Sequence, residues 1–308
     1  MPTDSVNHWL RAVEAEGLVL ARTRVSGDWG FSIGRRDAAV FHFVSEGHAC
    51  LRIEDAEPIE IAAGDLVVLP RGAPHVIGPS PECAVMPLER FLASHNGVFT
   101  QADVATTLVC GAIMLDRHML LPAIRSLPSM VRLTAEGESS TSPVGLSLEL
   151  LRREVENKAV GNEIVVRHLV SILFVYILRE WAETAPGRIG DWFSALRNPH
   201  VARALACIHN APAGDWTLAR LAVESGLSRS AFARQFQILV GEPPHSYLIR
   251  WRMGVAAQLL EQSSLQVSEI AVRVGYQSEF SFSRAFRKAR GLSPMQARKR
   301  PVTGAPGR

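Results

Sequence analysis

The chain has 308 residues, of which 47% are hydrophobic and 20% are charged. This composition can supply two globular cores and excludes disorder as the main character of the chain. The formal net charge of +3 conceals an asymmetry, because residues from Ala195 onward include 16 Lys and Arg against 6 Asp and Glu, whereas residues 1–194 include 17 against 24. A basic C-terminal third on an otherwise acidic chain is typical of a domain that binds a polyanion such as nucleic acid.

The sequence indicates neither a membrane span nor an oxidising compartment. Its longest apolar run, Leu169–Leu178, has ten residues, well short of the ~20 that a membrane-spanning helix needs. The N-terminus has no basic region that leads into an apolar stretch, so we expect no signal peptide. The cysteines, Cys50, Cys83, Cys110 and Cys207, form no CxxC pair. We therefore expect a cytoplasmic protein without a disulfide framework.

Short strands are predicted for the first third of the chain, from about Arg22 to Val85. Apolar segments alternate there with turn residues, in the order AVFHFV, ACLRIED, EPIEIA and DLVVLP. Strands of this length and spacing are typical of a small antiparallel barrel or sandwich. The segment TLVCGAIML, around Leu108–Met114, predicts a further strand, and LLPAIRSLPSMVRL predicts a partly helical segment interrupted by proline.

The hydrophobic period becomes helical between Ser147 and Glu183. SLELLRREVENKAV and EIVVRHLVSILFVYILREWAE predict two helices, and the second is apolar almost all round at its middle. Such a helix is buried, either in its own core or against a second copy of itself. We therefore expect the helix over Glu163–Glu180, together with Ser147–Val160, to support a homodimer.

The segment ETAPGRIG, Glu183–Gly190, contains one proline and two glycines and is the best candidate for a linker. We expect a cupin-like antiparallel β-barrel with helices, acting in sensing and dimerisation, at 1–190. An all-α domain with two helix-turn-helix units is expected at 191–308. The predicted fold class is therefore α+β.

An internal repeat of about fifty residues is the strongest signal in the chain. Its copies are LARLAVESGLSRSAFARQFQILVGEPP and VSEIAVRVGYQSEFSFSRAFRKARGLSP. Ala222 and Gly226 recur as Ala271 and Gly275. Beyond the turn five residues recur fifty positions later, namely Ser228, Phe232, Arg234, Phe236 and Gly241 as Ser278, Phe282, Arg284, Phe286 and Gly291.

The spacing within each copy predicts a helix-turn-helix. A small alanine lets two helices approach, a glycine takes the turn with a left-handed backbone, and the serine caps the second helix. The two phenylalanines, at i and i+4, lie on one inward face. The segment PPHSYLIRWRMGVAAQLLEQ between the copies predicts a long helical spacer. Side chains able to reach bases and phosphates lie on the opposite faces: Ser230, Arg234 and Gln237, and Glu279, Ser281, Arg284 and Lys288. A purely structural helical repeat is the alternative.

The region from about Pro199 to Arg298 closely resembles the DNA-binding domain of the AraC/XylS family of bacterial transcription regulators. The resemblance rests on WTLARLAVESGLSRSAFARQF, YLIRWRMGVAAQLL and IAVRVGYQSEFSFSRAFRKARGLSPMQAR. In that family two recognition helices enter successive segments of the major groove of double-stranded DNA. By position the resemblance implies that Ser230, Ala233 and Arg234 face DNA from the first helix, and Glu279, Ser281, Ser283 and Arg284 from the second. Ala233 offers only a methyl group and Glu279 only accepts hydrogen bonds.

The segment GDLVVLPRGAPH, Gly64–His75, resembles the second cupin motif, in which a His points into the barrel. FHFVSEGHACLRIE resembles the strand–turn–strand before it. Cupin metal sites usually add two His and a Glu from the first motif, but only His42 occupies an inward position here, and Val40 stands where the Glu is expected. Two readings stay open. His42 and His75 either bind a divalent metal, completed by Glu46, His48 or a cysteine, or, as we favour, line a ligand cavity as polar residues.

Cys110 is the candidate for a redox sensor. The domain looks like the cupin-type sensor of one branch of the AraC family, and some members of that branch respond to oxidants through cysteine. A reactive cysteine needs a lowered pKa, whereas a buried structural cysteine is the common state. The segment Arg22–Asp28 contains no cysteine that could pair with Cys110.

The leading hypothesis is a sequence-specific, homodimeric DNA-binding transcription regulator whose cupin domain senses a small ligand or an oxidant. The resemblance implies an activator that contacts RNA polymerase, although the residues do not distinguish activation from repression. A cupin-type metal-dependent enzyme is one alternative, and the incomplete metal motif argues against it. An architectural protein that binds DNA without sequence preference is the other, and the distinct outward residues argue against that. We therefore expect no enzymatic activity and no obligatory cofactor.

Overall fold

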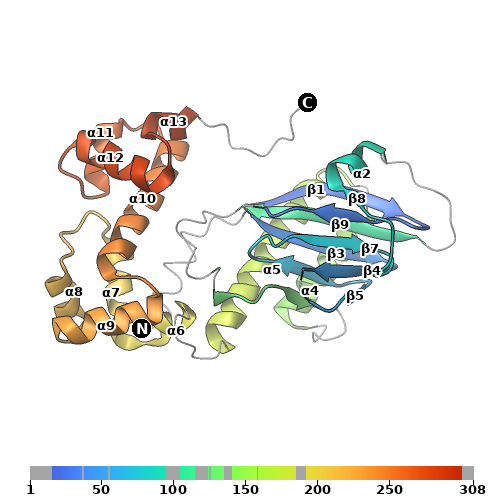
Figure 1. Ribbon diagram of the computed structural model, residues 1–308, viewed down its shortest axis with the longest axis horizontal. Helices are drawn as coiled ribbons and strands as arrows, with labels where there is room; N and C mark the ends of the chain where they lie inside the picture. The colour runs from blue at the N-terminus through green and yellow to red at the C-terminus, as the bar shows by residue number, and fades with distance from the viewer. Residues whose placement is uncertain are drawn as a thin grey trace. The chain divides into compact units, whose positions relative to one another are not determined.

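A computed structural model gives the fold (Figure 1). It describes residues 16–94, 105–114, 124–134, 141–184 and 192–299, except the single positions 37, 55, 125 and 158. The chain divides into two compact units. One comprises Glu14–Leu115 with Leu127–Glu180, and the other includes Trp181–Arg308.

Ten described strands in the first unit form two five-stranded sheets. One sheet has the order β1 (Glu16–Val25), β9 (Thr106–Met114), β3 (Ala39–Glu46), β6 (Leu66–Leu69) and β10 (Val131–Leu133). The other has the order β5 (Ile59–Ala62), β4 (His48–Ile53), β7 (His75–Gly78), β2 (Phe31–Ile33) and β8 (Met86–Pro87). The expected cupin-like, sheet-rich region is confirmed. Within the described residues its two sheets do not close into one barrel, and the β2–β8 pair is parallel.

Strand β3 is buried on both of its faces. Val40 and Val44 belong to the core between the two sheets, and His42 lies on the same face because side chains alternate along a strand. Phe41 and Phe43 point to the other face and are also fully buried. Helix α4 (Pro143–Glu156) packs against β3. This double burial explains why the segment is apolar without alternation.

The helices of the first unit begin and end at local signals. Helix α4 begins earlier than the predicted Ser147, because the Ser142 side chain caps it by accepting from the backbone N–H of Gly145 and proline occupies its first turn. It ends at Glu156, before Gly161, whose φ of +83° favours glycine. Helix α5 follows at Asn162–Thr184, and the short helix α2 at Leu88–Ser94.

One prediction for this unit is corrected by the structure, and another concerns residues that the structure mostly does not describe. The end of the segment predicted to be partly helical is strand β10, because it pairs with β6 in the first sheet. The expected linker at residues 183–190 lies mostly outside the part of the chain that the structure describes. No helix in the described part is long and apolar enough to cross a membrane.

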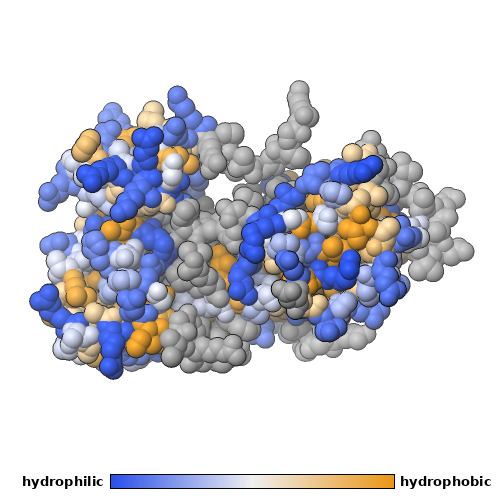
Figure 2. Space-filling model, in the orientation of Figure 1, coloured by the Kyte–Doolittle hydropathy of each residue, from blue (hydrophilic) through white to orange (hydrophobic). Residues whose placement is uncertain are grey.

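The second unit is helical throughout its described residues, as predicted. Its face in Figure 2 carries mostly hydrophilic side chains. Its helices are α6 (Trp192–Arg197), α7 (Pro199–Asn210), α8 (Leu218–Ser225), α9 (Arg229–Val240), α10 (Pro244–Gln262), α11 (Val267–Arg273), α12 (Glu279–Arg290) and α13 (Pro294–Lys299). The two copies of the repeat correspond to α8–α9 and α11–α12, and the predicted spacer is α10.

Candidate functional site

The turn between the helices of each repeat has the predicted backbone. Gly226 and Gly275 have φ values of +68° and +82°, in the left-handed region that glycine adopts without strain. The hydroxyl of Ser228 accepts a hydrogen bond from the backbone N–H of Ala231, and that of Ser278 accepts one from Ser281. Both serines therefore cap the second helix of their unit, as predicted.

The aromatic pairs fix the inward face of each second helix. Phe232 and Phe236 are fully buried, with ring centroids 5.5 Å apart. Phe282 and Phe286 repeat this arrangement at 5.6 Å. Because these pairs hold one face of α9 and of α12 in the core, the other face of each helix is directed to solvent.

The residues predicted to contact DNA lie mostly on these outer faces. Arg234 and Arg284 are exposed at equivalent positions, and Ala233 and Ser283 are half-buried at the preceding ones. The Ser281 hydroxyl donates to the backbone oxygen of Ser278 and accepts from the Ser278 hydroxyl, each at 2.9 Å, so most of its hydrogen-bonding capacity serves the cap. The remaining predicted residues are also exposed, namely Ser230, Gln237, Glu279 and Lys288.

Arg252, in the middle of α10, joins the two helix-turn-helix units, a role that sequence analysis missed. Its guanidinium donates to the backbone oxygen of Pro212 at 2.7 Å and of Gly214 at 2.8 Å, on the first unit's side. It also donates to the oxygen of Gly275 in the second unit, at 3.5 Å. A Cβ at Gly275 would meet the guanidinium. No sequence signal marks this arginine, because all three acceptors are backbone groups that only the tertiary fold brings to it.

The three predicted sensor residues are brought together between the sheets of the first unit. Nδ1 of His42 lies 3.0 Å from the sulfur of Cys110, and its Nε2 lies 2.8 Å from Nε2 of His75. Nδ1 of His75 lies 2.7 Å from the backbone oxygen of Ala73. Since a carbonyl only accepts, His75 donates from Nδ1 and its neutral ring accepts at Nε2. His42 then donates from Nε2 and accepts at Nδ1 from the Cys110 thiol.

Burial keeps all three groups of this Cys110–His42–His75 chain neutral. Burial lowers the pKa of His42 well below its usual value, and the neighbouring His75 lowers it further. Burial also lowers the pKa of His75, partly opposed by its bond to Ala73. The pKa of the Cys110 thiol is raised to about 12, again by burial. The resting cysteine is therefore a thiol with a base beside it, and not a preformed thiolate.

The chain of hydrogen bonds fits a metal site poorly. Two nitrogens on one tetrahedral zinc stand ~3.3 Å apart, so the two Nε2 atoms would have to separate. Cys110 contacts the opposite nitrogen of His42 and cannot bind the same ion. Glu46 accepts from the Thr107 hydroxyl and is exposed, as is His48. No group of three or more metal-ligating side chains occurs among the described residues. Metal binding by His42 and His75 therefore stays a prediction, and these two side chains are the protein ligands it would use.

The other cysteines of the first unit, Cys50 and Cys83, both lie beside Gly78 of the second sheet. Cys50 pairs with Gly78 in the second sheet, and the Cys83 sulfur lies so close to Gly78 that a Cβ there would clash. Both thiols are free and buried. The residue opposite Cys110 in β1 is Ala21. Among the described residues, the polar neighbour of the Cys110 sulfur is His42. Because Ala21 stands opposite Cys110, no disulfide joins Cys110 to β1.

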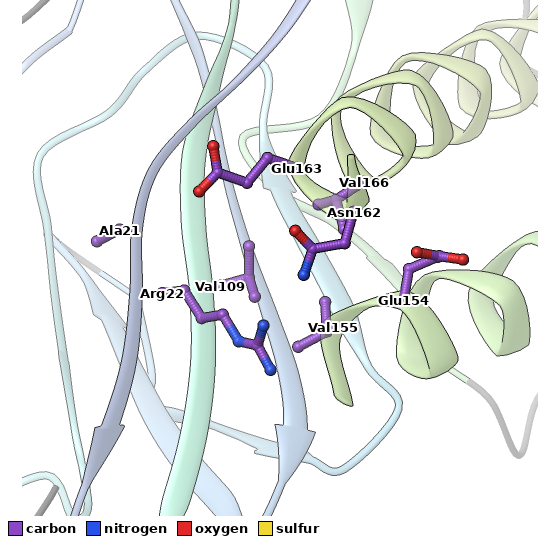
Figure 3. A pocket seen from close by; sticks show the side chains of 8 residues that line it. All are labelled: Ala21, Arg22, Val109, Glu154, Val155, Asn162, Glu163 and Val166. Atoms are coloured by element: carbon purple, nitrogen blue, oxygen red, sulfur yellow. The ribbon is translucent and has the colours of Figure 1, made fainter. Parts of the chain in front are cut away.

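A pocket of about 170 Å³ lies on the other face of the first sheet, where α4 and α5 cover β1 and β9 (Figure 3). Val109, next to Cys110 in sequence, contributes to its wall. Val155 and Val166 give it apolar surface, and the charged side chains Arg22, Glu154 and Glu163 surround it. Sequence analysis placed the ligand cavity at His42 and His75, which lie between the two sheets. It did not predict this pocket on the opposite face of the first sheet.

Comparisons with known proteins match both units. The cupin family model matches residues 4–183, and a helix-turn-helix domain model matches residues 221–300. The HTH-type transcriptional regulator AlkR of Acinetobacter baylyi is 31% identical over 90% of this chain and 92% of its own. A putative AraC-like transcription regulator of Streptomyces lividans is 30% identical over 97% of this chain and 99% of its own. Among solved structures, one match is the DNA-binding domain of AdpA in complex with a target DNA. The two sequences are 33% identical, the match spans 33% of this chain and 90% of the AdpA chain, and the TM-score is 0.32.

Proposed function

The chain belongs to the AraC family of transcription regulators that carry an N-terminal cupin domain, and we propose that a chemical change at Cys110, His42 and His75 controls its binding to DNA. As a member of this family it is a sequence-specific DNA-binding protein and not an enzyme. The observation that carries the proposal is the directed hydrogen-bond chain from the Cys110 thiol to the backbone oxygen of Ala73. This hydrogen-bond chain is a connected set of polar side chains in an otherwise apolar core.

DNA binding uses both helix-turn-helix units. Arg234 and Arg284 lie at equivalent exposed positions, from which a guanidinium can bind guanine O6 and N7 together, or a phosphate. The basic C-terminal third supplies the electrostatic attraction to the phosphate backbone. We assign base contacts to Ser230, Ala233, Glu279 and Ser283, and support of the helix cap to Ser281.

The geometry at Cys110 favours an oxidant as the signal. When a peroxide reacts, one of its oxygen atoms bonds to the sulfur as the O–O bond breaks. The thiol proton passes to Nδ1 of His42 and then to the leaving alcohol or water, so that the products are a sulfenic acid and that alcohol or water. His75 accepts from Nε2 of His42 and so stabilises the transient imidazolium. Little thiolate exists at neutral pH, because burial raises the pKa of Cys110, and burial also lowers the pKa of His42, so the thiol proton moves to His42 only while the S–O bond forms.

A small ligand is the second candidate signal, and the pocket between the first sheet and the helices α4 and α5 supports it. Arg22 offers a cation and Glu163 an anion at its rim, which suits a small molecule with polar ends and an apolar middle (Figure 3). Such a ligand would act on β9 from the side opposite to Cys110. A substitution of Val109 by Trp, which fills the pocket, separates this signal from the oxidant.

We also infer a cytoplasmic homodimer that activates transcription by contact with RNA polymerase. Exposed apolar side chains support self-association, and they follow helical spacing on α4 and α5. Leu146 and Leu150 are four residues apart, and Ile164 and Ile172 are eight residues apart, so each pair lies on one side of its helix. An exposed apolar surface on the sensor unit is the expected signature of an interface between two copies.

The decisive experiment measures occupancy of genomic DNA with and without a peroxide, in the wild type and in the Cys110→Ser variant. We expect discrete sites whose occupancy changes with the oxidant only when Cys110 is present. Uniform occupancy along the genome would instead indicate an architectural protein. Elemental analysis of the purified protein tests the metal alternative, which requires a near-stoichiometric ion that the His42→Ala and His75→Ala variants lose.

A further inference from the structure

Phe280 is an exposed aromatic residue in the first turn of the second recognition helix, α12. Its exposed fraction is 81%, although a large apolar side chain is usually covered. Successive residues of a helix are ~100° apart, so Phe280 points almost directly away from Phe282, which is buried in the core. Arg284 and Arg287 follow at i+4 and i+7, and they therefore share the outward face with Phe280.

The fold of the unit does not require an aromatic residue at this position. The equivalent residue of the first unit, fifty positions earlier, is Ser230, which is also exposed. The two units are otherwise built alike, with the same caps, glycines and inward phenylalanines. The aromatic ring therefore serves a contact outside the unit.

The neighbours of Phe280 indicate what that contact is. Arg284, Arg287 and Lys288 follow it on the same helix and are exposed, which favours a polyanion over an apolar protein surface. The hydroxyl of Ser281, the residue after Phe280, is held by Ser278. The first turn of α12 therefore offers an apolar surface at a place where a recognition helix reaches base edges.

We propose that Phe280 reads thymine in the half-site bound by the second unit, by contact with the C5-methyl group in the major groove. This methyl group is the one apolar feature that distinguishes bases there, and aromatic or small apolar side chains contact it. Because Ser230 offers no such surface, the two half-sites differ, and the protein binds its site in one orientation. The inference rests on the proposed binding of both units to DNA.

The experiment replaces thymine by deoxyuridine, which lacks only the methyl group and keeps the same base pairing. The full-length protein first selects its site from random duplex DNA, and each thymine of the selected site is then replaced in turn. We expect one position, or two adjacent positions, in one half-site where the replacement weakens binding about 4-fold, the effect of one buried methyl-sized group. In Phe280→Ala this replacement has no further effect, because the variant has already lost the contact.

A matched control is Ser230→Ala, which leaves the deoxyuridine effect unchanged because it lies in the other unit. Phe280→Leu retains part of the effect, since leucine still offers an apolar surface. Equal deoxyuridine effects in the wild type and in Phe280→Ala would overturn the inference, as would loss of self-association in Phe280→Ala with DNA affinity intact. If instead no sequence is selected at all, the proposed DNA binding itself fails, and the two failures are thereby distinguished.

Discussion

His42 and Cys110 face each other directly across the β3–β9 pair, with Nδ1 of the histidine 3.0 Å from the sulfur. Both side chains point into the core between the sheets, where Val40, Val44 and Leu108 surround them with apolar atoms. In this environment the hydrogen bonds to His75 and Ala73 determine which atom carries each proton. The sulfur is therefore neutral at rest but has a base positioned to take its proton.

The first prediction concerns the response to oxidant. Cys110→Ser abolishes the peroxide-dependent change in DNA binding and leaves the affinity of the untreated protein within about twofold, because Cys110 lies in the sensor unit and not on the DNA-binding helices. His42→Gln slows the reaction about 10²-fold or more by removing the base. A binding titration before and after peroxide treatment measures both. Cys207→Ser, a half-buried cysteine of α7, is the matched control and responds normally.

The second prediction is a pH window for stability. The two histidines have lowered pKa values in the folded protein, so the unfolded chain binds more protons below about pH 6.5 and their contribution to stability is lost as the pH falls. Cys110 has a raised pKa, so the unfolded thiol ionises first and stability falls between about pH 9 and 12. Urea unfolding of the full chain over a pH series measures this window. In Cys110→Ala we expect a smaller loss of stability at alkaline pH, because this thiol no longer contributes to it. If the loss of stability at alkaline pH is unchanged in this variant, it does not arise from Cys110.

The third prediction distinguishes the roles of Arg234 and Arg284. If the guanidinium binds a guanine, its replacement by Ala costs about 1–3 kcal/mol and relaxes preference at one base pair. If it binds a phosphate, all sequences are weakened alike and the salt dependence falls by about one unit. We expect each variant to affect a different half of one site, about one DNA turn apart. A titration against the site, scanned base by base, measures this, and full specificity in both variants would exclude these helices from the groove.

The fourth prediction concerns the hydrogen bonds by which Arg252 connects the two helix-turn-helix units. Arg252→Met removes the hydrogen bonds to Pro212, Gly214 and Gly275, so the orientation of one unit relative to the other is no longer fixed. We expect affinity for the full site to fall about tenfold, affinity for a single half-site to stay unchanged, and one inserted base pair to be better tolerated. Arg250→Met is the control, since the ion pair of Arg250 is with Glu242, which follows the second helix of the first unit. An equal loss on full and half sites would show that Arg252 supports folding alone.

The fifth prediction concerns self-association. Ile164→Asp and Ile172→Asp place a charge on the exposed apolar side of α5, and we expect each to weaken the dimer at least tenfold without unfolding the protein. Sedimentation of the full-length protein at micromolar concentration measures the change. Val223→Asp, at an exposed apolar residue of α8, leaves the dimer intact. A wild-type protein that is monomeric under these conditions would contradict the prediction.

The sequence by itself determined the DNA-binding unit almost completely. Its signals are local: a glycine with positive φ at Gly226 and Gly275, a serine cap at Ser228 and Ser278, and phenylalanines four residues apart. Each acts within a few residues along the chain, so periodicity and turn chemistry were sufficient to predict it. In β3 both faces are buried and no alternation marks the inward one, so the inward position of His42 was expected only from the resemblance to the cupin motif.

Only the tertiary structure decided how distant residues combine. Cys110 comes from β9, 68 positions after His42, and their contact depends on the register between two strands that no local pattern specifies. The three acceptors of Arg252 and the exposure of Phe280 depend in the same way on which surfaces the fold covers. Every residue has a backbone carbonyl, and any side chain can meet solvent, so the residue types alone do not reveal such contacts. The role of Arg252 and the exposure of Phe280 are therefore seen only in the folded chain.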